Sequence, residues 1–121
     1  MEKDKKKALV LLKALVFHYH GLDPDEKQIL EEYVKKIKAD EELQWSLDFI
    51  SRDYLSAFDR SREFLGKVFK KLPSEERLQY LIDTWEDNHK KGYVTEMETS
   101  AMINLAKDWS IQKEFLKSVN D

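Results

Sequence analysis

The stretch that decides the fold is residues 83–109, DTWEDNHKKGYVTEMETSAMINLAKDW. Its pattern predicts the end of one helix, a short connection around Gly92, and a second helix that begins after Thr95. Thr95 and Glu98 match a capping box, in which the threonine side chain accepts a backbone N–H and the glutamate reaches back to the cap residue. We therefore predict a helix–turn–helix unit here.

A similar unit lies near the N-terminus. An apolar helical pattern ends at His20-Gly21, and the sequence Asp23-Pro24-Asp25-Glu26 opens the next helix. Asp23 is the predicted cap, and Pro24 takes the first helical position, where its missing N–H costs nothing. When Glu26 is aligned with Glu98, the two glycines differ by one position. This alignment predicts a pseudo-twofold repeat with a one-residue gap.

Composition favours an all-α protein with a single domain that spans residues 1–121. The chain has 121 residues, of which 41% are hydrophobic and 37% are charged, with only three glycines and two prolines. This length supports one compact core, and the scarcity of glycine and proline leaves little material for tight turns or linkers. We expect a helical bundle with short connections.

Apolar periodicity predicts about seven helices, near residues 4–20, 24–38, 41–51, 54–71, 74–91, 96–109 and 111–119. The first is apolar around much of its circumference, which is typical of a central, buried helix. Asp40 and Ser110 are the predicted caps of the third and last helices. Gly66 is expected at a close helix crossing, and Gly92 at a left-handed helix end.

Charge and composition exclude several classes of function. The net charge is −3 and its signs alternate along the chain, so nucleic acid is not the expected partner. The chain has no cysteine, which excludes disulfides and cysteine-bound metals and suits a cytoplasmic protein. No apolar run approaches the roughly 20 residues that cross a bilayer, so we expect a soluble chain with no integral membrane segment.

Catalytic motifs are also missing from the sequence. It contains no glycine-rich phosphate loop, nucleophile elbow or HExxH helix. We therefore expect a protein that is not an enzyme. The competing hypothesis, a small hydrolase, requires a buried carboxylate or histidine with a shifted pKa in a closed pocket.

Carboxylates cluster in sequence around the two glycine turns. If a twofold axis brings the turns together, these groups converge on a hard cation such as calcium or magnesium. The alternative is that two pairs are helix caps and the others form a solvated rim. The residues concerned are Asp23, Asp25, Glu26, Asp83, Glu86, Asp87, Glu96 and Glu98.

Aromatic residues suggest a second kind of function. The chain has more aromatic side chains than its core requires, among them Tyr54, Phe58, Tyr80 and Tyr93. Such residues are enriched where proteins bind one another. The alternative to a metal site is therefore a metal-independent module that binds an unidentified protein partner in an aromatic groove between helices.

The two turns together resemble those of the TerB-like tellurite-resistance family. The likeness rests on residues 92–98, GYVTEME, and residues 21–26, GLDPDE, and it spans about residues 8–112. It implies an all-helical fold and a non-enzymatic role in bacterial stress or tellurite response. It also implies a divalent-cation site, for which the matching positions are Glu26 and Glu98. Family members usually have aspartate before each glycine, whereas this chain has His20 and Lys91.

Overall fold

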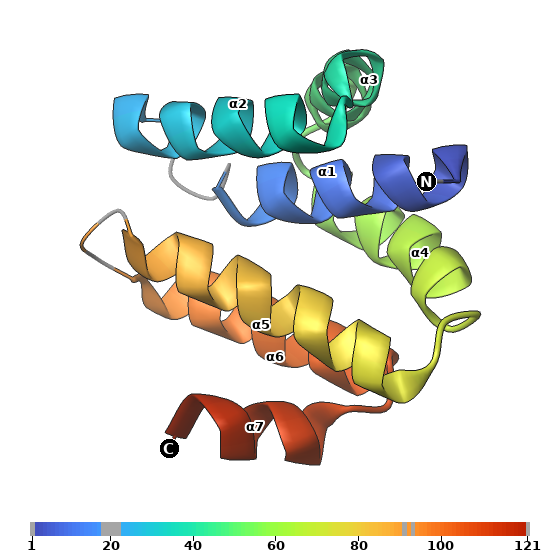
Figure 1. The fold of residues 1–121 in the computed structure, drawn as a ribbon, viewed down its shortest axis with the longest axis vertical. Helices are drawn as coiled ribbons and strands as arrows, with labels where there is room; N and C mark the ends of the chain where they lie inside the picture. Colours follow the sequence, from blue (N-terminus) through green and yellow to red (C-terminus); the bar gives the residue numbers. More distant parts are fainter. Residues whose placement is uncertain (1, 18–22, 91, 93, 121) are drawn as a thin grey trace.

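The chain folds as a bundle of α-helices, and the computed structural model describes residues 2–17, 23–90, 92 and 94–120 (Figure 1). The described residues form seven helices and no strand, so the prediction of an all-α bundle is confirmed. None of these helices is long and apolar enough to cross a membrane. The helices are α1 (Lys3–Phe17), α2 (Pro24–Ile37), α3 (Asp40–Ser51), α4 (Ala57–Phe69), α5 (Ser74–Lys90), α6 (Glu96–Asp108) and α7 (Gln112–Asn120).

Helix α1 is the centre of the bundle, as its apolar sequence predicted. Every residue from Ala8 to Phe17 is buried, and α1 contacts α2, α3, α4, α5 and α6. Figure 1 shows α1 lying between α2 above it and the α5–α6 pair below it. The first and second halves of the chain therefore share one hydrophobic core that is built around α1.

Both predicted capping boxes are present. Asp23 Oδ1 accepts from the backbone N–H of Glu26 at 2.8 Å, and Glu26 Oε1 accepts from the N–H of Asp23 at 3.3 Å. Thr95 Oγ1 and Glu98 form the same reciprocal pair, with both bonds at 3.2 Å. Helices α2 and α6 therefore begin where the sequence placed them, while the twofold relation between the two units remains a prediction.

The start of α4 differs from the prediction, because the helix begins at Ala57 and not at Tyr54. Asp53 Oδ1 accepts from the N–H of Leu55 at 3.1 Å, and Asp53 Oδ2 accepts from the hydroxyl of Ser56 at 3.0 Å. Such short-range bonds give the backbone an alternative to helix. The connection from α3 consequently leaves Tyr54 and Leu55 exposed.

Two predicted caps are wrong. Helix α3 already includes Asp40, and the residue before it, Ala39, makes no side-chain cap. Ser110 has a φ of 60°, and α7 begins only at Gln112, so the serine belongs to the turn after α6. Neither Asp40 nor Ser110 therefore stands at the residue directly before a helix, where a cap would lie.

The two glycines of the second half also have different roles from each other. Gly92 has a φ of +92° and its N–H donates to the carbonyl of His89 at 3.0 Å, so the predicted left-handed helix end is confirmed. The prediction for Gly66 is wrong, because no described residue of another helix comes within 4 Å of the place where a Cβ would be. Gly66 lines a surface hollow between α4 and Asp108 and does not mark a helix crossing.

The second half of the bundle is held to α4 by Trp109 and Arg77. The Trp109 side chain is fully buried and stacks on Phe69, with ring centroids 4.1 Å apart. The Arg77 guanidinium donates to the carbonyl of Trp109 at 3.0 Å and to the carbonyls of Lys70 and Leu72. The end of α6 and the α4–α5 connection are therefore fixed to each other.

Candidate binding groove

A groove opens between α1, α2 and α5, where the two halves of the bundle meet. It consists of two cavities of 360 and 200 Å³ that share part of their lining, and we refer to it as the α1–α2–α5 groove. The shared residues are Lys13, Tyr33, Lys36 and Asp83. The larger, charged end adds Ile29, Glu32, Glu86, Asp87 and Lys90, and the smaller, more apolar end adds Leu9, Ile37, Tyr80 and Thr84.

Helical spacing explains why these residues share a groove. Side chains three, four and seven residues apart lie on the same face of a helix. On α5 this face presents Tyr80, Asp83, Thr84 and Asp87, and on α2 it presents Ile29, Glu32, Tyr33 and Lys36. Helix α1 forms the floor with Leu9 and Lys13. The groove is therefore composed of one face from each of three helices.

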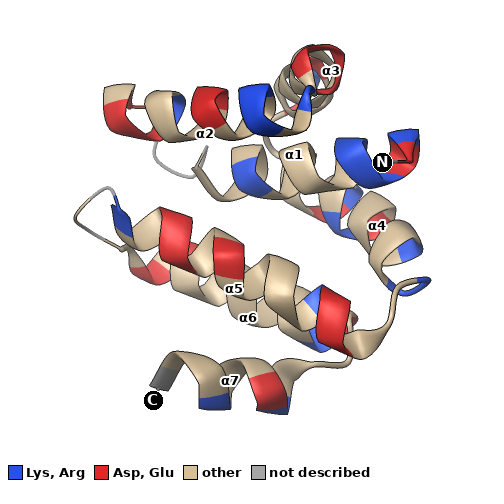
Figure 2. Cartoon of the chain, viewed as in Figure 1, with Lys and Arg blue, Asp and Glu red and all other residues tan. Residues whose placement is uncertain are grey.

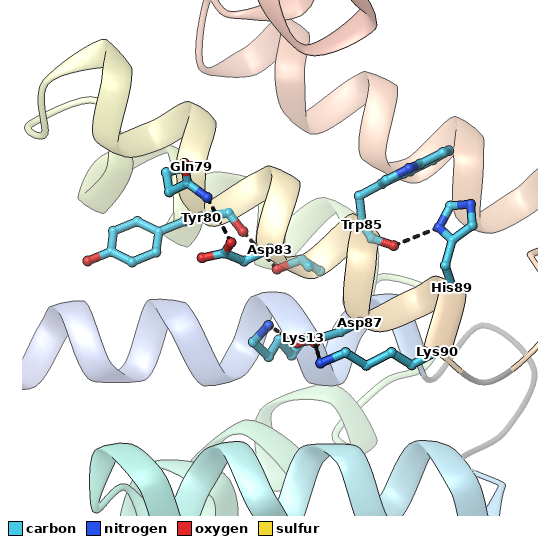
Figure 3. Close-up of polar contacts among 9 residues, drawn as sticks. Lys13, Gln79, Tyr80, Asp83, Trp85, Asp87, His89 and Lys90 are labelled. Carbon is cyan, nitrogen blue, oxygen red and sulfur yellow. Dashed lines mark hydrogen bonds and ion pairs between the residues drawn. The ribbon is translucent and has the colours of Figure 1, made fainter. Parts of the chain in front are cut away.

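Lys13 is the central polar group of the groove. Only 3% of Lys13 is exposed, and it is the only buried lysine in the described part of the chain. Its ammonium forms an ion pair with Asp87 and lies over the ring of Tyr33, 4.4 Å from the ring centroid. Figure 3 shows Lys13 on α1 reaching towards Asp87 on α5, with Lys90 on the other side of that carboxylate.

Burial governs the protonation of Lys13 and Tyr33. Removal from water lowers the pKa of Lys13, and the attraction of Asp87 only partly opposes this effect. Removal from water also raises the pKa of the Tyr33 phenol, and Asp83 and Asp87 add to the increase. The phenol is therefore neutral at physiological pH, and the amine loses its proton more readily than an exposed lysine.

A second charged contact joins α1 to α5 beyond the apolar end of the groove. Lys5 Nζ lies 2.6 Å from Glu76 Oε1 and 5.2 Å from the ring centroid of Tyr80. The hydrogen bond to Glu76 is the main reason that the pKa of Lys5 is raised. Because Lys5 and Lys13 lie about two helical turns apart, α1 is attached to α5 at two points along one face.

The charges around the groove are mixed. Helix α2 contributes Glu32 and Lys36, and α5 contributes Asp83, Glu86 and Lys90. Figure 2 shows acidic residues at several points along α5 and both signs of charge along α2. The groove can accordingly hold a ligand through apolar contacts at one end and through polar contacts at the other.

The predicted metal residues lie elsewhere. Glu26 and Glu98 are both 0% exposed, and neither lines the groove. Each carboxylate accepts hydrogen bonds within its own capping box. Across the described residues, no three His, Cys, Asp or Glu side chains gather closely enough to hold a metal ion. His20 and Lys91 lie outside the described residues, and the calcium or magnesium site remains a prediction.

Sequence reasoning found some groove residues and missed others. Of the carboxylates near the turns, only Asp83, Glu86 and Asp87 line the groove. Tyr80 was among the surplus aromatic residues, and it is half-buried at the apolar end. Lys13 was missed, although one lysine inside the apolar run of residues 8–17 was a usable signal. Lysine is almost never buried without a partner.

Comparisons with known proteins add no assignment. Protein-family models, curated proteins and solved structures all gave no match to this chain. The likeness to the TerB-like family therefore rests on the two turn sequences, and the groove is identified from its geometry.

Proposed function

We propose that this chain is a non-enzymatic, TerB-like binding module that holds a segment of a partner protein in the α1–α2–α5 groove. The observation that supports the proposal is the continuity of the groove across the two halves of the bundle, with Tyr33 and Tyr80 half-buried in its walls. Tyrosine suits such a surface, because its ring makes apolar contacts while its hydroxyl forms a hydrogen bond, as that of Tyr80 does to Glu76 Oε1 at 3.3 Å.

The shape and chemistry of the groove define the kind of segment it accepts. The 360 Å³ end is at the lower limit of small-molecule sites, which measure about 300–1,000 Å³. The 200 Å³ end is smaller still and is lined by Leu9, Ile37 and the two tyrosine rings. These dimensions suit side chains that project from a helix or an extended segment. We expect one apolar anchor with a charged residue beside it.

The described polar groups favour binding over hydrolysis. The described histidine, His89, is exposed and hydrogen-bonds the carbonyl of Trp85 at 2.8 Å, outside the groove. The buried group with a shifted pKa in the groove is a lysine, whereas a hydrolase of the kind considered above uses a carboxylate or a histidine. A role in stress or tellurite resistance is part of the proposal and rests on the family resemblance.

The test of partner binding uses two adjacent lysines of α2. Lys36 lines both ends of the groove, while Lys35 is exposed and does not line it. We expect Lys36→Glu to reduce partner binding by at least about tenfold, since a reversed charge at an interface repels what the lysine attracted. The measurement is quantitative affinity capture with the intact chain, followed by calorimetric titration of the captured protein.

Lys35→Glu is the matched control. Both lysines lie in the last turn of α2, so both substitutions have the same unfavourable interaction with the helix dipole. A loss of binding that is restricted to Lys36→Glu assigns the partner to the groove. Equal binding by wild type and both variants would contradict the groove as the binding site.

A divalent cation is the second candidate ligand. It is favoured by the presence of two equivalent capping boxes, each with a fully buried glutamate. Calcium and magnesium both prefer carboxylate oxygens. We propose that this cation binds through Glu26 and Glu98.

The cation hypothesis predicts stabilisation that depends on these two carboxylates. A ligand present at about 100 times its Kd adds about 2.7 kcal/mol to the free energy of unfolding. We expect millimolar calcium or magnesium to raise the Tm of the chelator-stripped protein, and Glu26→Gln or Glu98→Gln to abolish the increase. Glutamine keeps a carbonyl oxygen for the cap, and exposed Glu96→Gln is the control. A Tm that no divalent cation changes would exclude this site.

A further inference from the structure

The Lys13 amine occupies an unusual position in the groove. It lines both cavities, although only 3% of the residue is exposed. One carboxylate, Asp87, is in direct contact with the nitrogen, and the ring of Tyr33 covers it from the side of α2. A compound bound in the groove therefore meets a primary amine that is desolvated and already has a group able to accept and return its protons.

Amines of this kind form covalent bonds with carbonyl compounds. The neutral form of lysine is the nucleophile, and desolvation increases the fraction that is neutral. Each proton transfer in the reaction requires a positioned acid or base. Lys13 and Asp87 meet both requirements within one ion pair. No other described lysine is both buried and paired with a carboxylate.

We propose that Lys13 captures a small, uncharged aldehyde or ketone as a protonated imine in the α1–α2–α5 groove, with Asp87 transferring the protons. This inference is separate from protein binding, and the two ligands are expected to compete for the groove. The product is a stoichiometric adduct that water can reverse, and it requires no oxidant or reductant.

The steps balance in atoms and charge. The Lys13 ammonium gives one proton to Asp87, and the neutral amine adds to the carbonyl carbon. At the same time Asp87 passes that proton to the carbonyl oxygen. The nitrogen then gives a second proton to Asp87, which returns it to the hydroxyl group as the C–O bond breaks and water leaves. The ammonium and carbonyl compound become a protonated imine and water. The positive charge remains on the nitrogen, beside Asp87.

The surroundings of Lys13 select for an uncharged compound. From α5 the amine faces Asp83, Asp87 and Lys90, and from α2 it faces Tyr33 and Lys36, with Glu32 and Glu86 at the same end. Four carboxylates against three ammonium groups disfavour an additional anion such as a keto acid. The 360 Å³ cavity limits the compound to a small one.

The experiment traps the imine on the intact protein. Propionaldehyde and cyanoborohydride are added at pH 7, and the alkylated lysines are located by peptide mass spectrometry. We expect Lys13 to be alkylated at least about tenfold faster than exposed Lys35, because positioned proton transfer contributes this much or more. Glyoxylate, an anionic aldehyde, is expected to label Lys13 more slowly than propionaldehyde does.

Variants and pH provide the controls. Asp87→Asn is expected to slow labelling of Lys13, while Asp59→Asn, at an exposed position of α4 outside the groove, leaves it unchanged; circular dichroism verifies that both variants are folded. The preference for Lys13 falls as pH approaches 10, where exposed lysines also lose their protons. Labelling of exposed lysines with Lys13 unmodified would overturn the proposal. That result would be obtained with the wild-type protein alone. It would not affect the test of partner binding, which compares Lys36→Glu with Lys35→Glu.

Discussion

Replacement of Asp87 with alanine is expected to lower the free energy of unfolding by about 3 kcal/mol at pH 7. This value is at the low end of the destabilisation that follows when one partner of a buried ion pair is removed. The side chains of Lys13 and Asp87 are 4% and 14% exposed, so the remaining ammonium has little access to water. Asp87 also pairs with Lys90 at 3.1 Å, but Lys90 is exposed and regains its hydration. Denaturant unfolding measures the loss.

The cost of Asp87→Ala depends on pH in a defined direction. The pKa of Lys13 is already lowered in the folded state. Removal of Asp87 lowers this pKa further, because the attraction between Asp87 and the ammonium raises it in the wild type. Below the ordinary lysine pKa, the unfolded variant then binds more protons than the folded variant does. The free energy of unfolding of the variant therefore rises with pH. We expect the deficit to shrink between pH 7 and 10. Glu86→Ala, at an exposed position on the rim of the same groove, should change stability by less than about 0.5 kcal/mol. A deficit that is equal at both pH values would contradict a charged Lys13.

Replacement of Trp109 with alanine is expected to cost about 4 kcal/mol, within the range for large-to-small changes of buried aromatic residues. Trp109 is fully buried and stacks on Phe69, and its backbone carbonyl accepts from Arg77. Truncation therefore leaves a cavity where α4 meets the end of α6. Thermal and denaturant unfolding both measure the effect.

Trp109→Phe separates ring packing from the indole N–H. The Nε1 atom of Trp109 is buried and has no hydrogen-bond partner among the described residues, and an unpaired donor of this kind is itself unfavourable. Phenylalanine keeps a ring against Phe69 and removes that donor, so we expect a loss of only about 1–2 kcal/mol. A Trp109→Ala variant that loses no more than Trp109→Phe would show that the stack contributes little.

The starts of α2 and α6 could be predicted from sequence because a capping box is a local signal. Asp23 and Thr95 meet their glutamates within three residues, so no distant contact is needed to determine where the helix begins. The start of α4 was missed because Asp53 makes competing local bonds that helical periodicity does not reveal. The position of Gly66 depends on which helices approach α4, and this is a property of the whole bundle.

The groove could be predicted only in part, because its central contact joins residues 74 positions apart. The sequence indicated Asp83, Glu86 and Asp87 as carboxylates near the second glycine turn and Tyr80 as a surplus aromatic residue. It did not indicate that Lys13 reaches α5, since that requires the packing of α1 between two halves. An isolated lysine in an apolar helix predicts a buried partner without identifying it.

The two contacts between α1 and α5 also affect how the chain is made. Lys5 and Lys13 find their carboxylates 71 and 74 residues further along the chain. At a synthesis rate of about 5–20 residues per second, α1 leaves the ribosome several seconds before α5 exists. During that time the amine of Lys13 is in water, where it interrupts the longest apolar run of the nascent chain. We therefore expect the lysine that later pairs with Asp87 to oppose aggregation of this run while the chain is being made.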